Sequence, residues 1–97
     1  MTGTDTIERA RTARPGTGHD ANAFVVVLND HHNTFEGVAA AIARIVPGVD
    51  YSGGMALATQ IHQLGRARVW AGPLEVAELY WEQLRDSGLT MAPIERG

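Results

Sequence analysis

Apolar and polar positions divide the chain into a polar N-terminal segment and a patterned remainder. The segment 1–22 is rich in threonine, glycine and arginine and holds almost nothing large and apolar. Such a segment buries too little surface to offset the entropy lost on ordering it. We therefore predict a flexible N-terminal tail over 1–22. Because 97 residues support one modest core, we predict a single folded domain over 23–97.

Three stretches of the remainder have the patterns of strands. The first is the run AFVVVLN, from Ala23 to Asn29, whose continuous apolar and β-branched character is typical of a strand at a sheet centre or buried on both faces. The second, Arg66 to Ala71, alternates polar and apolar residues. The third, Leu89 to Glu95, is short, and its Pro93 is compatible only with an edge strand.

Helical spacing of apolar residues fills the intervals between the strands. The first predicted helix runs from Phe35 to Val46, after a cap by Asn33 or Thr34. The second begins at Asp50 or Ser52 and ends at Gly65. The third begins at Gly72-Pro73 and ends at Gly88. Within the second helix, Gly53 and Gly54 weaken the first turn by roughly 1 kcal/mol each. The order β-α-α-β-α-β predicts an α+β sandwich, in which a three-stranded sheet packs with three helices.

Composition removes several classes of function. Eight basic and eleven acidic residues give a formal charge of −3, which argues against a nucleic-acid partner. The absence of cysteine excludes disulfides, thiolate zinc sites and thiol catalysis. No apolar run approaches the ~20 residues that cross a bilayer, and 1–22 lacks the apolar core of a secretory signal. We expect no membrane partner and a cytoplasmic location.

The histidines and serines do not have the spacing of a catalytic or metal site. His31 and His32 are adjacent, so their side chains diverge in an extended loop, and His62 has no partner one turn away on its predicted helix. Ser52 and Ser87 are beside no base in the sequence, and no glycine-rich phosphate loop follows the first strand. We therefore expect no metal, no cofactor and no enzymatic activity.

Asn29, Asp30 and His62 form a more informative set. Asn29 and Asp30 follow the first strand, at a strand end where small ligands are often held, and His62 approaches them if its helix packs beside that end. An amide oxygen, a carboxylate and a neutral imidazole nitrogen are acceptors suited to an ammonium group. The bland alternative, that Asn29 and Asp30 are only turn residues, is favoured by the residue types alone.

Several segments resemble the ClpS family, the adaptors that pass N-degron substrates to a Clp AAA+ unfoldase. The resemblance covers about Ala23 to Arg96. It rests on VVVLND followed by a helix with Glu36, on IHQLGRA in place of the family's V-H-Y-Q-G-K-A, on LEVAE at Leu74 to Glu78, and on the closing LTMAPIE. The resemblance implies a pocket for the first residue of a peptide that begins with Phe, Leu, Tyr or Trp.

By position, the resemblance assigns Asn29, Asp30 and His62 to the free α-amino group of that peptide. The residues that it places around the hydrophobic pocket are Phe35, Val38, Ala58, Thr59, Thr90 and Met91. Phe35 stands where the family usually has a methionine gate, and Ala58 replaces another methionine. His31 replaces an aspartate. Because Phe35 adds bulk at the gate and Ala58 removes it from the wall, the preferred first residue is expected to differ from the family's.

The resemblance also implies a partner, the N-domain of a Clp AAA+ unfoldase of the ClpA or ClpC type. Glu75 matches a contact glutamate of the family, whereas Tyr80 replaces a lysine. The N-terminal tail is expected to be engaged by the unfoldase during hand-over. An alternative stays open: a ClpS-like module that serves another protein partner, without a role in proteolysis.

Overall fold

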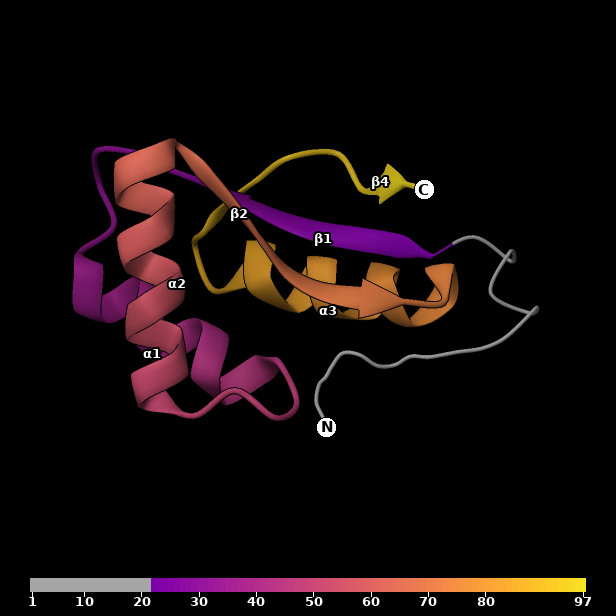
Figure 1. The fold of residues 1–97 in the computed structure, drawn as a ribbon, viewed down its shortest axis with the longest axis horizontal. Helices are drawn as coiled ribbons and strands as arrows, with labels where there is room; N and C mark the ends of the chain where they lie inside the picture. Colours follow the sequence, from indigo (N-terminus) through magenta and orange to yellow (C-terminus); the bar gives the residue numbers. More distant parts are fainter. Residues whose placement is uncertain (1–21) are drawn as a thin grey trace.

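A computed structural model describes residues 22–97 and shows the α+β architecture that the sequence predicts. The predicted tail lies outside the described residues, apart from Asn22. The elements are the strands β1 (Ala23–Leu28), β2 (Arg66–Gly72), β3 (Thr90–Met91) and β4 (Glu95–Arg96), and the helices α1 (Phe35–Ile45), α2 (Tyr51–Leu64) and α3 (Leu74–Asp86). In Figure 1, α3 runs along the sheet, and α1 and α2 cross near the end of β1.

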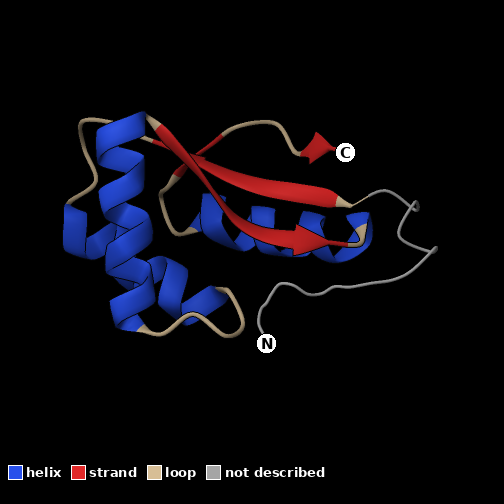
Figure 2. Ribbon diagram, in the orientation of Figure 1, coloured by secondary structure: helices blue, strands red, loops and turns tan. Residues whose placement is uncertain are grey.

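Strand β1 is the centre of an antiparallel sheet (Figure 2), as its continuous apolar run predicts. Strand β2 pairs with one edge of β1, and β3 and β4 pair with the other edge. The third predicted strand is therefore two short pieces rather than one. Between them the Ala92 N–H still donates to the Val26 carbonyl at 3.1 Å. Pro93, which has no N–H to offer, marks the break.

The two faces of β1 are covered by different chemistry. Ala23, Val25 and Val27 point one way and belong to the same core cluster as Ala77 and Leu84 of α3. The alternation of a strand then sends Phe24, Val26 and Leu28 to the opposite face.

On that opposite face, Glu95 of β4 reaches across β1 to Arg66 and Arg68 of β2. The Arg68 guanidinium lies 4.0 Å from the centre of the Phe24 ring. Val26, on the same face, is fully buried. Stacked and ion-paired side chains thus shield this face, because long arginine stems cover apolar surface while their charged heads stay in water.

The helix starts follow the polar residues that the sequence offers as caps. The Thr34 hydroxyl accepts from the Gly37 N–H at 2.9 Å, and the Asp50 carboxylate accepts from the Gly53 N–H at 2.8 Å. Of the two alternatives for each helix, the structure therefore uses Thr34 and Asp50. Helix α3 begins after Pro73 without a side-chain cap.

The packing of α2 against α1 explains why position 54, in the first turn of α2, is a glycine. A Cβ atom at this position would overlap the carbonyl oxygen of Ala39 in α1 and lie 3.1 Å from its carbon. The glycine therefore permits a close crossing of the two helices. Ala58 and His62 follow at four-residue steps on the same side of α2, so this crossing also sets how far they lie from α1.

Within residues 22–97, no helix is long and apolar enough to cross a membrane.

Candidate ligand-binding site

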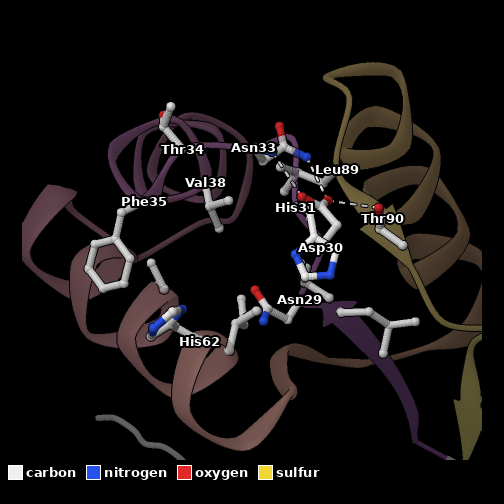
Figure 3. A pocket seen from close by; sticks show the side chains of 14 residues that line it. Asn29, Asp30, His31, Asn33, Thr34, Phe35, Val38, His62, Leu89 and Thr90 are labelled. Atoms are coloured by element: carbon white, nitrogen blue, oxygen red, sulfur yellow. Dashed lines mark hydrogen bonds between the residues drawn. The ribbon is translucent and has the colours of Figure 1, made fainter.

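A cavity of about 360 Å³ opens where β1 ends, between α1 and α2. Figure 3 shows the side chains that surround it. They come from the end of β1 and the loop after it, the start of α1, the second half of α2 and the start of β3 with the residue before it. The lining residues are Val27, Leu28, Asn29, Asp30, His31, Asn33, Thr34, Phe35, Val38, Ala58, Ile61, His62, Leu89 and Thr90.

Gly65 brings Asn29 and His62 to the same end of the cavity. Its backbone is left-handed, with φ +88°, which lets the chain leave α2 while its N–H still donates to the Ile61 carbonyl at 2.8 Å. The Gly65 carbonyl then accepts from the Asn29 N–H at 2.9 Å. Because His62 lies about one turn before Gly65, this bond places its imidazole beside the end of β1.

The polar groups of Asn29 and His62 are available to a ligand. Both residues are exposed, and neither side chain makes a hydrogen bond to another of residues 22–97. In Figure 3 both side chains border the same space, together with Phe35 and Val38. An amide and an imidazole are thus presented at the mouth of the cavity without internal partners.

Apolar side chains from both helices form the adjoining wall. Phe35 and Val38 of α1 are half-buried, and Ala58 of α2 is 3% exposed. The Phe35 ring meets the His62 imidazole edge-on, with centroids 6.0 Å apart and planes at 80°. This is a favourable geometry for two aromatic rings, and it fixes one side of the imidazole.

The Asp30 carboxylate, unlike the side chain of its neighbour Asn29, accepts several hydrogen bonds from other residues of the protein. One oxygen accepts from the backbone N–H groups of His32 (3.1 Å) and Asn33 (2.8 Å), and the other accepts from Asn33 Nδ2 (2.7 Å) and Thr90 Oγ1 (2.8 Å). Burial by itself would raise the pKa of Asp30, but the hydrogen bonds from Asn33, Thr90 and His32 outweigh it and hold the pKa far below its usual range. The group is a carboxylate at any ordinary pH.

Seven of the nine predicted site residues line this cavity: Asn29, Asp30, Phe35, Val38, Ala58, His62 and Thr90. Thr59 and Met91 are not among the lining residues. The Thr59 hydroxyl instead donates to the Met55 carbonyl at 2.9 Å, and Met91 packs against the core.

Among the other lining residues, Ile61 and Leu89 are apolar residues of a predicted helix and a predicted strand, and the sequence offered no signal that they line a site. Asn33 and His31 belong to the polar cluster after the first strand, and this cluster was the only sequence signal that pointed to them.

The two residues assigned to an unfoldase contact lie on α3, away from the cavity. Glu75 is exposed in the first turn. Tyr80 is half-buried, and its ring packs edge-on against Trp70 of β2 at a centroid distance of 5.0 Å. Tyr80 therefore contributes packing to the fold.

The adjacent histidines have different surroundings. His31 lines the cavity, whereas His32 Nε2 lies 3.7 Å from an Asp30 oxygen. In the part of the chain that the structure describes, no group of three or more His, Cys, Asp or Glu side chains is arranged to hold a metal ion.

Comparison with known proteins decides the family. The family described as "ATP-dependent Clp protease adaptor protein ClpS" matches residues 19–92, well over half of the chain. The chain belongs to the ClpS family. A ClpS adapter protein of the ATP-dependent Clp protease from Thermosynechococcus vestitus is 49% identical over 77 residues, which cover 79% of this chain and 82% of the relative. The corresponding protein of Nostoc sp. is 50% identical over 74 residues, 76% of each chain.

A more distant ClpS relative comes from the alga Chlamydomonas reinhardtii. This chloroplastic adapter protein is 37% identical over 77 residues, which cover 79% of the present chain but 44% of the algal one. The ClpS match thus includes β1, α1, α2, β2, α3 and β3. All of the cavity residues lie within it.

Proposed function

We propose that this ClpS-family chain is a substrate adaptor of an ATP-dependent Clp protease. It binds the free α-amino group and the large hydrophobic first residue of N-degron substrates and delivers them to a Clp AAA+ unfoldase. The observation that carries the proposal is the pairing of two acceptors, on Asn29 and His62, that bond to no other described residue, with a cavity that has an apolar wall at the end of β1.

The acceptors suit an ammonium group. A peptide α-amino group at neutral pH offers N–H donors and a positive charge, and an amide oxygen and a neutral imidazole nitrogen accept such donors. An N-acetylated terminus has lost the charge and most of the donors. Once a bound peptide covers these acceptors, leaving one of them unpaired costs ~1–3 kcal/mol, so a blocked terminus binds much more weakly.

The cavity suits one large apolar side chain. Its volume of about 360 Å³ exceeds the roughly 150 Å³ of an apolar cavity that admits benzene. Burial of a Leu or Phe side chain stabilises a complex by ~1.5–3 kcal/mol. Phe35, Val38 and Ala58 supply the apolar surface for this burial.

The proposal involves binding and delivery without a chemical step. His62 faces no carboxylate partner in the cavity, because Asp30 is engaged by Asn33 and Thr90. A general base needs an orienting group and a reacting group within hydrogen-bond reach, and neither is provided here.

Delivery requires a second surface. Glu75 on the exposed side of α3 remains our proposed contact with the unfoldase N-domain, of the ClpA or ClpC type. The N-terminal tail is the proposed element that the unfoldase engages. Tyr80, which packs on Trp70, contributes to this contact only through the part of its ring that remains exposed.

Fluorescence anisotropy with a labelled peptide that begins with Leu or Phe, and with its N-acetylated copy, tests the proposal. The free peptide is expected to bind at least tenfold more tightly than the acetylated one, and His62→Ala is expected to remove most of that difference. Gln63→Ala, an exposed position next to His62 on α2, is the matched control. Equal affinities for the two peptides would contradict the assignment of the amino-group site.

Pull-down with a purified Clp unfoldase N-domain separates delivery from the alternative of a module for another partner. Capture that Glu75→Arg weakens supports delivery. Peptide binding without any capture by either a ClpA- or a ClpC-type domain would favour the alternative.

A further inference from the structure

The loop after β1 is fastened to the C-terminal part of the chain through one carboxylate. Asp30 receives four hydrogen bonds, from the His32 and Asn33 backbone, from Asn33 Nδ2 and from Thr90 Oγ1, all between 2.7 and 3.1 Å. An ionised carboxylate offers about four lone-pair positions. These four donors therefore occupy its acceptor capacity, and Figure 3 shows the dashed bonds that join Asp30 to Asn33 and Thr90.

The same group of side chains spans a long distance along the sequence. Thr90 is 60 residues from Asp30, and Asn33 Nδ2 also donates to the Gly88 carbonyl, 55 residues away, at 2.8 Å. We call Asp30, Asn33 and Thr90 the loop anchor. In the lining of the cavity, it joins the loop that precedes α1 to strand β3.

Asn29 is held between this anchor and a second bond. Its own N–H is bonded to the Gly65 carbonyl on one side, and the next residue is fixed by the anchor on the other side. Its backbone thus has little freedom, and this limits the directions in which its side-chain amide can extend into the cavity. The Asp30 side chain is 11% exposed, so little of it faces a ligand.

We infer that Asp30 is a positioning residue of the peptide site, which acts through the loop anchor to orient Asn29, rather than a direct ligand of the α-amino group. This inference rests on the proposed function. The amino group is then held by neutral acceptors, Asn29 and His62. Thr90 sets affinity through its hydroxyl, although that hydroxyl is bonded to Asp30 instead of to the peptide.

The hydroxyl of Thr90 offers a test that leaves Asp30 in place. Thr90→Val keeps the shape of the side chain but removes the donor, so the loop spends less time in the binding arrangement and the apparent affinity for a Leu-initiated peptide falls roughly five- to tenfold. Thr90→Ser restores the donor and recovers most of that loss. Combining Thr90→Val with Asp30→Asn weakens binding no further than Asp30→Asn alone, because both act on one linkage.

A direct ligand would behave in the opposite way. Removal of the Thr90 hydroxyl would free an Asp30 oxygen for the ammonium group, and affinity would stay constant or rise. An unchanged or tighter Thr90→Val variant, beside an Asp30→Asn variant that no longer distinguishes free from acetylated peptide, would overturn the inference.

A measurement without peptide separates this inference from the proposed function. The His32 and Asn33 amides both donate to Asp30 Oδ1. In the ligand-free full chain, Thr90→Val and Asp30→Asn are expected to speed hydrogen exchange at these two amides severalfold and to shift the Asn29 side-chain NH₂ signal, and Thr90→Ser is expected to do neither.

Asp50→Asn is the matched control, because it removes a carboxylate that caps α2 outside the cavity. It should leave the His32 and Asn33 exchange rates unchanged. Unchanged exchange in Thr90→Val and Asp30→Asn would refute the loop anchor, whatever peptides do. If exchange rises as expected but the wild type binds no hydrophobic N-terminus, the anchor stands and the proposed function fails.

Discussion

Asn29 and Asp30 are adjacent in the chain and border the same cavity, but their side chains are in opposite states. The side-chain amide of Asn29 has no hydrogen-bond partner among the described residues, whereas the Asp30 carboxylate has four donors. Both residue types are common after a strand, and both accept hydrogen bonds. The comparison indicates that Asn29, whose side chain has no internal hydrogen bond among the described residues, is the residue able to bind a ligand. Asp30, whose hydrogen-bonding capacity is used within the protein, instead holds the loop in place.

The largest expected effect comes from breaking the packing that both residues depend on. Gly54→Ala places a methyl group against the Ala39 carbonyl, so α1 and α2 must separate, and the free energy of unfolding is expected to fall by about 3 kcal/mol. Urea denaturation followed by circular dichroism measures this. Peptide affinity falls as well, because His62 moves away from Phe35.

Gly53→Ala is the matched control for this prediction. Its added methyl meets only the Val49 side chain at 3.2 Å and the Asp50 carboxylate at 3.4 Å, and it gains helix propensity. Its stability should equal or exceed that of the wild type. A Gly54→Ala protein as stable as Gly53→Ala would show that the helix crossing does not depend on the glycine.

The next effect tests the comparison itself. Asp30→Asn replaces one carboxylate oxygen with an NH₂ group, so at least one of the present donors faces another donor, and it removes the charge, so the free energy of unfolding should fall by about 2 kcal/mol. Asn29→Ala should change stability by less than about 0.5 kcal/mol but weaken peptide binding at least as much. If Asn29→Ala destabilised the fold as strongly as Asp30→Asn, the two side chains would not differ as the structure indicates.

Much of the architecture was predictable because its causes are local. The apolar run of β1, the Asp50 cap and the Gly65 terminus are each set by a few neighbouring residues, and the structure confirms them. The two-piece third strand could not be anticipated from Pro93 alone, because the break depends on how Ala92 still pairs with Val26. Pairing across the sheet is decided by residues far apart in the sequence.

The site was predictable in its residue types but not in its bonding. Convergence of Asn29 and His62 follows from the strand end and the helix that ends at Gly65. Three of the four donors to Asp30 belong to His32 and Asn33, as its interpretation as a turn residue indicates, but the fourth is Thr90, 60 residues away, and no local pattern signals that bond. Ala58 and Thr59 illustrate a second limit: neighbours on a helix differ by about 100° in direction, so only one of them faces the cavity, and helical phase is fixed by packing.

Lowering the pH distinguishes Asp30 from Asn29 in a further way, because only the Asp30 side chain titrates. The pKa of Asp30 is lower in the folded state than in the unfolded chain, so the stabilisation that it provides is complete above about pH 4 and is lost as pH falls through the lower, folded-state value. The stability difference between the wild type and Asp30→Asn, measured by urea denaturation, should therefore shrink from about pH 4 downward. A difference that stays constant to about pH 2 would mean that Asp30 has no such preference for its charged form.

The smallest expected effect comes from Phe35, whose ring packs against the His62 imidazole at the cavity. Phe35→Leu removes the ring that meets the His62 imidazole edge-on, a contact worth ~0.5–1.5 kcal/mol, and the imidazole gains freedom. The His62 ring-proton signals should move toward those of a free histidine, because the ring current of Phe35 is gone, and affinity for a Leu-initiated peptide should fall about two- to threefold. Stability changes little, because Phe35 is only half-buried and leucine keeps most of the apolar contact.

Phe35→Tyr keeps the ring and should retain the His62 signals. If Phe35→Leu left these signals in place, His62 would be oriented by its backbone on α2 alone, and Phe35 would act only as a wall of the cavity.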